Sequence, residues 1–119
     1  MTAVEYYNNL PYHRSDTTAP SSSSSLPTGP SELTILIDPV IATGATACAA
    51  IDTLKEWGVQ KIVLIAVLAS ETGLAKVAAE WEHGVEIFVA AVDPECDSNG
   101  MIKPGLGDVG DRMFLTVGK

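Results

Sequence analysis

The stretch Leu33–Thr46, LTILIDPVIATGAT, passes from a strand pattern to a helix pattern through a loop of small residues. Leu33–Ile37 is a short aliphatic run that favours a strand, and Asp38-Pro39 follows it, where a proline should stop strand pairing. A helix is predicted over Thr46–Trp57, because its apolar residues recur at helical spacing and Gly58 provides a C-terminal stop. The stretch therefore predicts a strand, a tight loop and the N-terminus of a helix.

The next part of the chain repeats this pattern. Lys61–Leu68, KIVLIAVL, is apolar on both faces, which is typical of a central parallel strand. Val85–Ala91 is predicted to be a third strand. Between them Ser70 is the expected N-cap of a second helix, whose apolar positions are Leu74, Val77, Ala78 and Trp81. The order strand, helix, strand, helix, strand predicts right-handed crossovers and a parallel α/β sheet.

The composition is that of one globular domain. The chain has 119 residues, of which 46% are hydrophobic and 18% charged. No apolar run reaches the ~18 residues of a transmembrane helix, and the N-terminus lacks the pattern of a secretory signal. A net charge of −8 argues against a nucleic-acid surface, which needs clustered Lys and Arg. Free thiols in a cytoplasmic protein are the favoured interpretation of Cys48 and Cys96, with a disulfide as the alternative.

Residues 1–32 differ in composition from the rest. They contain four prolines and the homopolymer Ser21–Ser25, which cannot bury enough apolar surface to become ordered. Val4–Leu10 has the residues of a short strand. We therefore expect a strand or hairpin arm followed by a flexible Ser/Pro-rich loop, with the α/β region over residues 33–119.

The loop before the first helix has the features of an anion site. In open α/β sheets ligands collect at the carboxyl ends of the strands, where loops lead into helix N-termini. Small residues would let backbone N–H groups approach an anion, hydroxyls would add donors, and Asp38 could accept hydrogen bonds from a sugar. The residues concerned are Ala42, Thr43, Gly44, Ala45 and Thr46. The alternative is an ordinary tight loop with Thr46 as helix N-cap and Asp38 in a turn. Neither a dinucleotide fingerprint nor a Walker loop is present.

A second unusual segment lies near the C-terminus. Residues 101–112, MIKPGLGDVGDR, combine a proline, three glycines, two aspartates and an arginine. This composition predicts neither helix nor strand in the glycine-dense loop that follows Asp93 and ends in Arg112-Met113-Phe114. It indicates either a floppy tail or a loop shaped around a ligand.

Both segments resemble motifs of one family. Residues 38–46, DPVIATGAT, resemble the 5-phosphoribosyl 1-diphosphate (PRPP) motif of type I phosphoribosyltransferases, in the Asp-Pro form of uracil phosphoribosyltransferases. Ala45 stands where that branch usually has glycine, which is tolerable if its φ is negative. Residues 101–112 closely resemble the family's uracil-binding signature, with Met101 in place of a tyrosine. The resemblance implies a parallel-sheet, Rossmann-like type I phosphoribosyltransferase fold, with residues 33–119 as its C-terminal part.

The resemblance also implies a reaction and its site. Uracil N1 would attack the anomeric carbon of PRPP and displace diphosphate, giving UMP. Asp38 and residues 42–46 would hold PRPP, and the backbone of Ile102, Gly107 and Val109 would hold uracil. Asp108 would face PRPP and its Mg²⁺ through water, so that Asp38 and Asp108 are the catalytic candidates and no residue ligates the metal directly.

Three further features have expected roles. Asp111 and Arg112 are expected to hold the shape of the loop through an ion pair, with a direct phosphate contact by Arg112 as the alternative. Residues 69–73 match the family's loop after the central strand, where we favour a simple helix cap. His13 and His83 lie in no motif and are expected at the surface.

The resemblance covers only part of the family's domain. Family members are longer and carry an arginine-bearing loop that contacts pyrophosphate, and nothing in this chain matches that loop. We therefore expect a truncated member whose own turnover is doubtful. A non-catalytic PRPP- or UMP-binding regulator and a fragment of a uridine kinase–phosphoribosyltransferase fusion are the alternatives. A missing half-sheet would expose apolar surface, so a homo-oligomer is expected.

Overall fold

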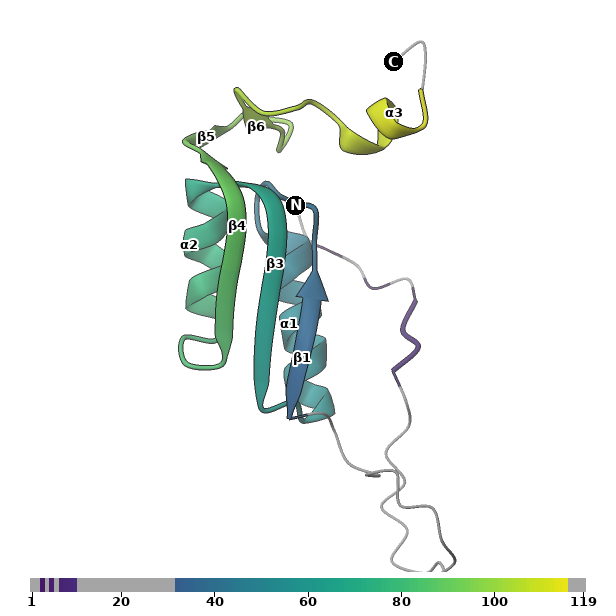
Figure 1. The fold of residues 1–119 in the computed structure, drawn as a ribbon, viewed down its shortest axis with the longest axis vertical. Coiled ribbons are helices and arrows are strands. Elements are labelled where there is room, and N and C mark those ends of the chain that lie inside the picture. Colours follow the sequence, from purple (N-terminus) through teal and green to yellow (C-terminus); the bar gives the residue numbers. More distant parts are fainter. Residues whose placement is uncertain (1–2, 4, 6, 11–31, 116–119) are drawn as a thin grey trace, which may run out of the picture.

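The computed structural model describes residues 3, 5, 7–10 and 32–115. Its main sheet is parallel, with β3 in the centre, β4 on one side, and β1 and β2 on the other. These strands are β1 (Leu33–Ile37), β2 (Val40–Ile41), β3 (Lys61–Ser70) and β4 (Val85–Asp93). Two helices, α1 (Ala45–Trp57) and α2 (Glu71–Glu80), lie on the same face of the sheet (Figure 1). The predicted element order and the parallel α/β sheet are confirmed.

One strand position is shared by β1 and β2. Ile37 pairs with Ile65 and Val40 with Leu68, so the register is the same before and after the proline. Pro39 has no N–H to donate, but its carbonyl accepts a hydrogen bond from the Val67 N–H at 3.0 Å. The prediction that pairing stops at the proline was therefore wrong. Pairing resumes after it and carries the chain to the start of the 42–46 loop.

The hydrophobic core lies between the sheet and the two helices. Alternate residues of β3 point into it, and α1 and α2 cover them with apolar side chains. The largest fully buried apolar side chains are Ile41, Ile51, Ile62, Leu64 and Val77. Their burial fixes the rotation of both helices about their axes, and so fixes where each helix N-terminus lies. None of the described helices is long and apolar enough to cross a membrane.

The opposite face of the sheet, which we call the outer face, is open among the described residues. Seven of its large apolar side chains are between 41% and 71% exposed. They are Leu33, Ile35, Ile37, Ile65, Val67, Phe88 and Val92. An ion pair between Lys61 and Glu86, at 3.1 Å, lies at the amino end of the same face. The central position predicted for Lys61–Leu68 is confirmed, and in the described part of the chain helices cover only one face of this strand.

Glycines lie at both ends of α1. Gly58, with φ 100°, donates its N–H to the carbonyls of Leu54 and Lys55 and ends α1 as predicted. At the other end α1 begins at Ala45, one residue before the predicted start. Gly44 is the N-cap, with φ 80° and no side-chain cap, so Thr46 lies within the first turn instead of capping it.

The segment after Asp93 is more regular than expected. It contains the antiparallel pair β5 (Glu95–Cys96) and β6 (Ile102–Lys103), and a short helix α3 (Val109–Met113). The prediction of neither helix nor strand was therefore wrong. Asp97 and Asp108 account for the difference, because the Asp97 carboxylate accepts the N–H groups of Asn99 and Met101 and the Asp108 carboxylate caps α3.

The predicted N-terminal arm is only partly described. Residues 5 and 7–10 lie in no strand, so the strand expected over Val4–Leu10 is not found at these positions. Val4, Tyr6 and the Ser-rich stretch lie outside the described residues. The Glu5 carboxylate accepts a hydrogen bond from the Thr53 hydroxyl at 2.8 Å, which places this segment against α1.

Candidate functional site

The carboxyl ends of the strands bring together the two segments singled out in the sequence. Because all four strands are parallel, the loops that follow β2, β3 and β4 emerge at one edge of the sheet. Figure 1 shows β5, β6 and α3 beyond this edge. Gly100, the residue just before the second segment, lies beside the first, since a Cβ placed on it would be 3.3 Å from the Thr43 methyl carbon.

The 42–46 loop has the geometry of an anion cradle. Gly44 takes the positive φ that the corner requires, so Ala45 keeps a negative φ, as the resemblance required. The Thr43 hydroxyl accepts the Ala45 N–H at 3.4 Å, a long hydrogen bond that a ligand could replace. Thr43 and Thr46 are both exposed, and the first turn of α1 directs its N–H groups out of the helix end.

The loop is held against the start of α2. A Cβ on Gly44 would lie 2.9 Å from the Gly73 carbonyl oxygen, and a Cβ on Gly73 would overlap the Ala42 carbonyl oxygen. Ser70 lies between them, fully buried, and its hydroxyl bonds to the Ala42 carbonyl at 2.5 Å and to the Gly73 N–H at 2.9 Å. The helix cap predicted at Ser70 is confirmed. Its bond to Ala42 is additional, and no sequence pattern could reveal it because the two residues are 28 positions apart.

Asp38 lies at the end of β1, as the sequence indicated. Its carboxyl is half-buried, and this burial raises its pKa above the ordinary value, while a hydrogen bond from the Val40 backbone N–H opposes the shift. A half-buried carboxylate at a strand end can accept hydrogen bonds from ligand hydroxyls. Since burial disfavours its charge, such donors would stabilise the ionised form.

The residues expected to contact a base lie in the second segment. The Ile102 side chain is buried in β6, so that only its backbone is available to a ligand. Gly107 has a φ of 72°, and a Cβ placed on it would meet nothing within 4 Å, so space is open beside it. Asp108 is exposed and one carboxylate oxygen accepts the Asp111 N–H, while Val109 begins α3. α3 has at most slight contact with the strands of the main sheet.

Two side chains hold this segment in place. The Asp93 carboxylate, at the end of β4, accepts the Gly105 N–H at 2.9 Å and so ties the loop to the strand edge. Arg112 donates a hydrogen bond to the Leu106 carbonyl at 3.1 Å. This contact helps to hold the shape of the loop. Sequence reasoning did not identify Asp93, whose only signal is its position at the end of a predicted strand.

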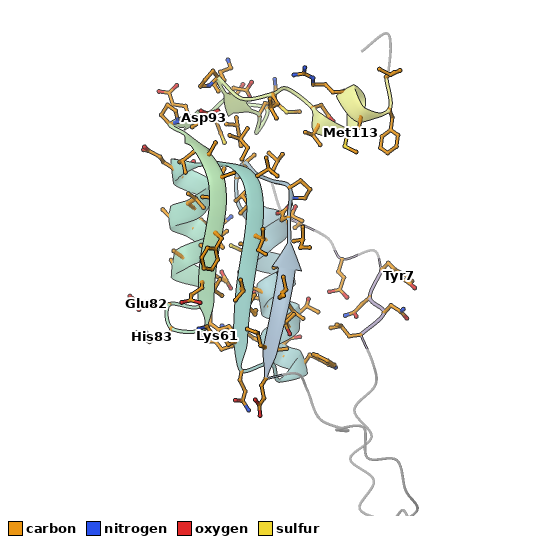
Figure 2. All side chains as sticks on the ribbon, viewed as in Figure 1. Tyr7, Lys61, Glu82, His83, Asp93 and Met113 are labelled. Carbon is orange, nitrogen blue, oxygen red and sulfur yellow. The ribbon has the colours of Figure 1, made fainter. Side chains whose placement is uncertain are left out.

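The remaining chemistry-bearing residues lie elsewhere. Figure 2 shows His83 and Glu82 at the opposite end of the sheet from Asp93, so His83 is a surface residue as expected. His13 lies outside the described residues. Cys48 and Cys96 are free thiols. Within the described part of the chain, no group of three or more His, Cys, Asp or Glu side chains could hold a metal ion.

A cavity of about 760 Å³ lies away from the strand edge, between α1 and residues 3, 5 and 7–10. It shares only Thr46 with the candidate site, and Leu36, Ala49 and Leu54 form much of its lining. Several polar groups around it are already paired within the chain, including Glu5 with Thr53. Both segments singled out in the sequence follow strands at the carboxyl edge of the sheet, and we place the candidate site there.

These features define a class of protein: a parallel α/β domain with a candidate anion site at a strand edge. A family profile described as "Uracil phosphoribosyltransferase" matches residues 1–116. The chain is 40% identical over 114 residues to "Putative uracil phosphoribosyltransferase urg2" of Schizosaccharomyces pombe, covering 96% of this chain and 47% of the relative. It is 48% identical over 83 residues to a uracil phosphoribosyltransferase of Campylobacter jejuni, covering 70% of this chain and 39% of the relative.

A solved structure has a similar fold. The AQ2163 protein of Aquifex aeolicus superposes with a TM-score of 0.68 and 33% sequence identity, over 80% of this chain and 45% of that chain. The chain belongs to the uracil phosphoribosyltransferase family. It has the parallel-sheet fold expected of a type I phosphoribosyltransferase, and it spans less than half the length of these relatives.

Proposed function

We propose that this chain provides the PRPP- and uracil-binding part of a uracil phosphoribosyltransferase. The proposed reaction joins uracil N1 to the anomeric carbon of PRPP, releases diphosphate and gives UMP. The observation that supports the proposal most directly is the position of Gly100, the residue just before the 101–112 segment, on which a Cβ would lie 3.3 Å from the Thr43 methyl carbon. A cytoplasmic site of action belongs to the same proposal.

The proposed roles follow from the geometry. Backbone N–H groups of residues 43–46, at the N-terminus of α1, would receive the 5′-phosphate. Asp38 would accept hydrogen bonds from the ribose hydroxyls, and the transition state would gain from this fixed positioning. Uracil is uncharged, so backbone groups of Ile102 and Gly107 are suited to read its donor and acceptor edge.

Mg²⁺ enters the proposal with the diphosphate. The described residues offer single carboxylates near the strand edge and no cluster, so the ion would be held by diphosphate oxygens and water. The exposed Asp108 carboxylate has one oxygen engaged at the α3 N-cap, and the other would accept a hydrogen bond from a metal-bound water. When bound, the ion would neutralise the charge of the leaving diphosphate.

A second candidate function is binding without turnover. Arg112 is the one arginine among the described residues, and one of its N–H groups already donates to the Leu106 carbonyl, so the described site has few cationic donors for a diphosphate. This observation favours a PRPP- or UMP-binding regulator, in which the same loops bind the nucleotide and no bond is made.

Two assays distinguish these functions. Calorimetry with UMP and with uridine measures binding and its dependence on the 5′-phosphate, and formation of UMP from uracil, PRPP and Mg²⁺ measures turnover. UMP binding with turnover supports the transferase, and UMP binding without turnover supports the regulator. Absence of UMP binding up to millimolar concentration contradicts both.

A further inference from the structure

We propose that Ser70 is a positioning residue for phosphate recognition, whose hydroxyl orients the Ala42–Thr43 peptide so that the Thr43 N–H faces the phosphate. The inference rests on the proposed function, because it concerns the same 42–46 loop. It gives Ser70 a role beyond the cap of α2.

The hydrogen-bond pattern around Ser70 allows one assignment of protons. A hydroxyl has one hydrogen to donate and two lone pairs to accept with. The Ala42 carbonyl, at 2.5 Å, can only accept, and the Gly73 N–H, at 2.9 Å, can only donate. The Ser70 hydrogen is therefore directed to Ala42, and the Thr72 hydroxyl at 3.1 Å must donate to Ser70. The one donor position and both acceptor positions of this fully buried hydroxyl are therefore occupied.

This arrangement sets the direction of a peptide in the loop. In a trans peptide the C=O and the following N–H point in opposite directions. Because the Ala42 carbonyl is turned toward Ser70 and α2, the Thr43 N–H is turned away from α2. Thr43 is exposed and lies beside Gly100, so its N–H is directed to the open side of the loop, where the proposed phosphate would bind.

The close packing of glycines strengthens the constraint. The Ala42 carbonyl occupies the position that a Cβ on Gly73 would take, and Gly44 is similarly close to the Gly73 carbonyl. The loop therefore lies directly on the first turn of α2, and a rotated Ala42–Thr43 peptide would leave a buried carbonyl without its donor. A loop fixed before the ligand binds loses less entropy on binding.

The positioning role is separable from the capping role. Capping α2 requires an acceptor for the Gly73 N–H, whereas orienting Ala42 requires a donor. Ala75 provides a matched control, because it is an exposed residue in the middle of α2. Ala75→Gly weakens the helix to an extent comparable with loss of a cap but leaves the Ser70 hydroxyl in place.

The test uses the full chain with Ser70→Ala, Ser70→Thr and Ala75→Gly, titrated with UMP and uridine at a temperature where all remain folded. Ser70→Ala is expected to weaken UMP binding about three- to tenfold and to leave uridine binding unchanged. Ser70→Thr, which keeps the hydroxyl, and Ala75→Gly should bind UMP within about twofold of the wild type. Equal UMP affinity of Ser70→Ala and wild type, or an equal loss in Ala75→Gly, would overturn the positioning role.

A ligand-free measurement separates this inference from the proposed function. NMR relaxation of the ¹⁵N-labelled chain reports backbone order at Thr43 and Gly44 without any nucleotide. Ser70→Ala should lower these order parameters from about 0.85 toward about 0.6, and Ala75→Gly should not. Unchanged order in Ser70→Ala overturns the inference even if UMP binds. Absence of UMP binding by a chain that shows this loss of order overturns the proposed function, and with it the phosphate, while the ordering of the 42–46 loop by Ser70 stands.

Discussion

Gly44 lies so close to Gly73 that a Cβ on the first would stand 2.9 Å from the carbonyl oxygen of the second. Gly44 also has a φ of 80°, which residues with a side chain rarely adopt. Two independent constraints, one conformational and one steric, therefore require glycine at the N-cap of α1. Because both act on the 42–46 loop, stability and ligand binding are coupled at this position.

Gly44→Ala is expected to lower both stability and UMP affinity. The strained φ and the contact with Gly73 together should cost about 2–4 kcal/mol in the free energy of unfolding. Gly107→Ala is the control, because Gly107 has a φ of 72° but a Cβ placed on it would have no atom within 4 Å. It should lose only about 1–2 kcal/mol. Urea denaturation measures both, and equal losses in the two variants would show that the contact with Gly73 has no cost.

Asp38→Asn is expected to raise the melting temperature at pH 7 while weakening UMP binding. Burial raises the pKa of Asp38 above 3.8, so the folded state binds this proton more tightly than the unfolded state. The stability that the protonated Asp38 contributes is present below pH 3.8 and is lost as the pH rises through the raised pKa. The ionised carboxylate therefore costs stability at pH 7, and the gain from asparagine should shrink as the pH approaches 3.8. A lower melting temperature of the variant at pH 7 would contradict this explanation.

The contact between α1 and α2 contains a second acidic group with a shifted pKa. A hydrogen bond with Asp52 raises the pKa of Glu80 above 4.5, and burial adds to the shift, while Lys55 opposes it. As with Asp38, the folded state binds this proton more tightly than the unfolded state. The stability from Glu80 is therefore present below pH 4.5 and is lost as the pH rises through the raised pKa. Glu80→Gln should stabilise the fold at pH 7 by no more than about 1 kcal/mol, since the group is largely solvated.

Asp52→Asn should stabilise the fold at pH 7 by a similar amount, because it removes the other carboxyl group of the same interacting pair. The double variant with Glu80→Gln should gain little beyond either single variant, which thermal unfolding at pH 7 would measure. Fully additive gains would show that the two groups do not interact.

The outer face is expected to mediate association between copies of this chain. Its apolar side chains form a continuous surface over β1, β3 and β4, and its lysine and glutamate neutralise each other. Phe88→Lys should therefore convert an oligomer into a monomer, as measured by light scattering. Met113→Lys is the control, because Met113 is 72% exposed but lies on α3. A monomeric mass for the wild-type chain would contradict the expected association.

Much of the fold could be predicted because its signals are local. Strand propensity and the glycine stops placed β1, the end of α1 and the cap of α2 correctly. The short elements after Asp93 were missed, because α3 depends on one capping carboxylate and β5–β6 on one Asx turn. Such elements are too short for hydrophobic periodicity to reveal.

The candidate site was predicted less completely. Motif resemblance selected the two loops, and the parallel sheet explains why they meet at one edge. The supports of those loops could not be predicted, because Ser70 and Ala42 interact across 28 positions and Asp93 and Gly105 across 12. Exposed apolar surface was expected, but a strand that is apolar on both faces does not reveal which of its faces is open.

The proposed function requires that the 42–46 and 101–112 loops form one nucleotide site, and an NMR titration of the ¹⁵N-labelled chain with UMP tests this requirement. We expect the amide resonances of residues 43–46 and of residues 102–109 to shift together, with a single dissociation constant. Shifts confined to one loop would show that the two loops do not share a ligand. Shifts centred on Ala49, Ala50 and Thr53, which line the cavity along α1, would place the nucleotide in that cavity and contradict the strand-edge site.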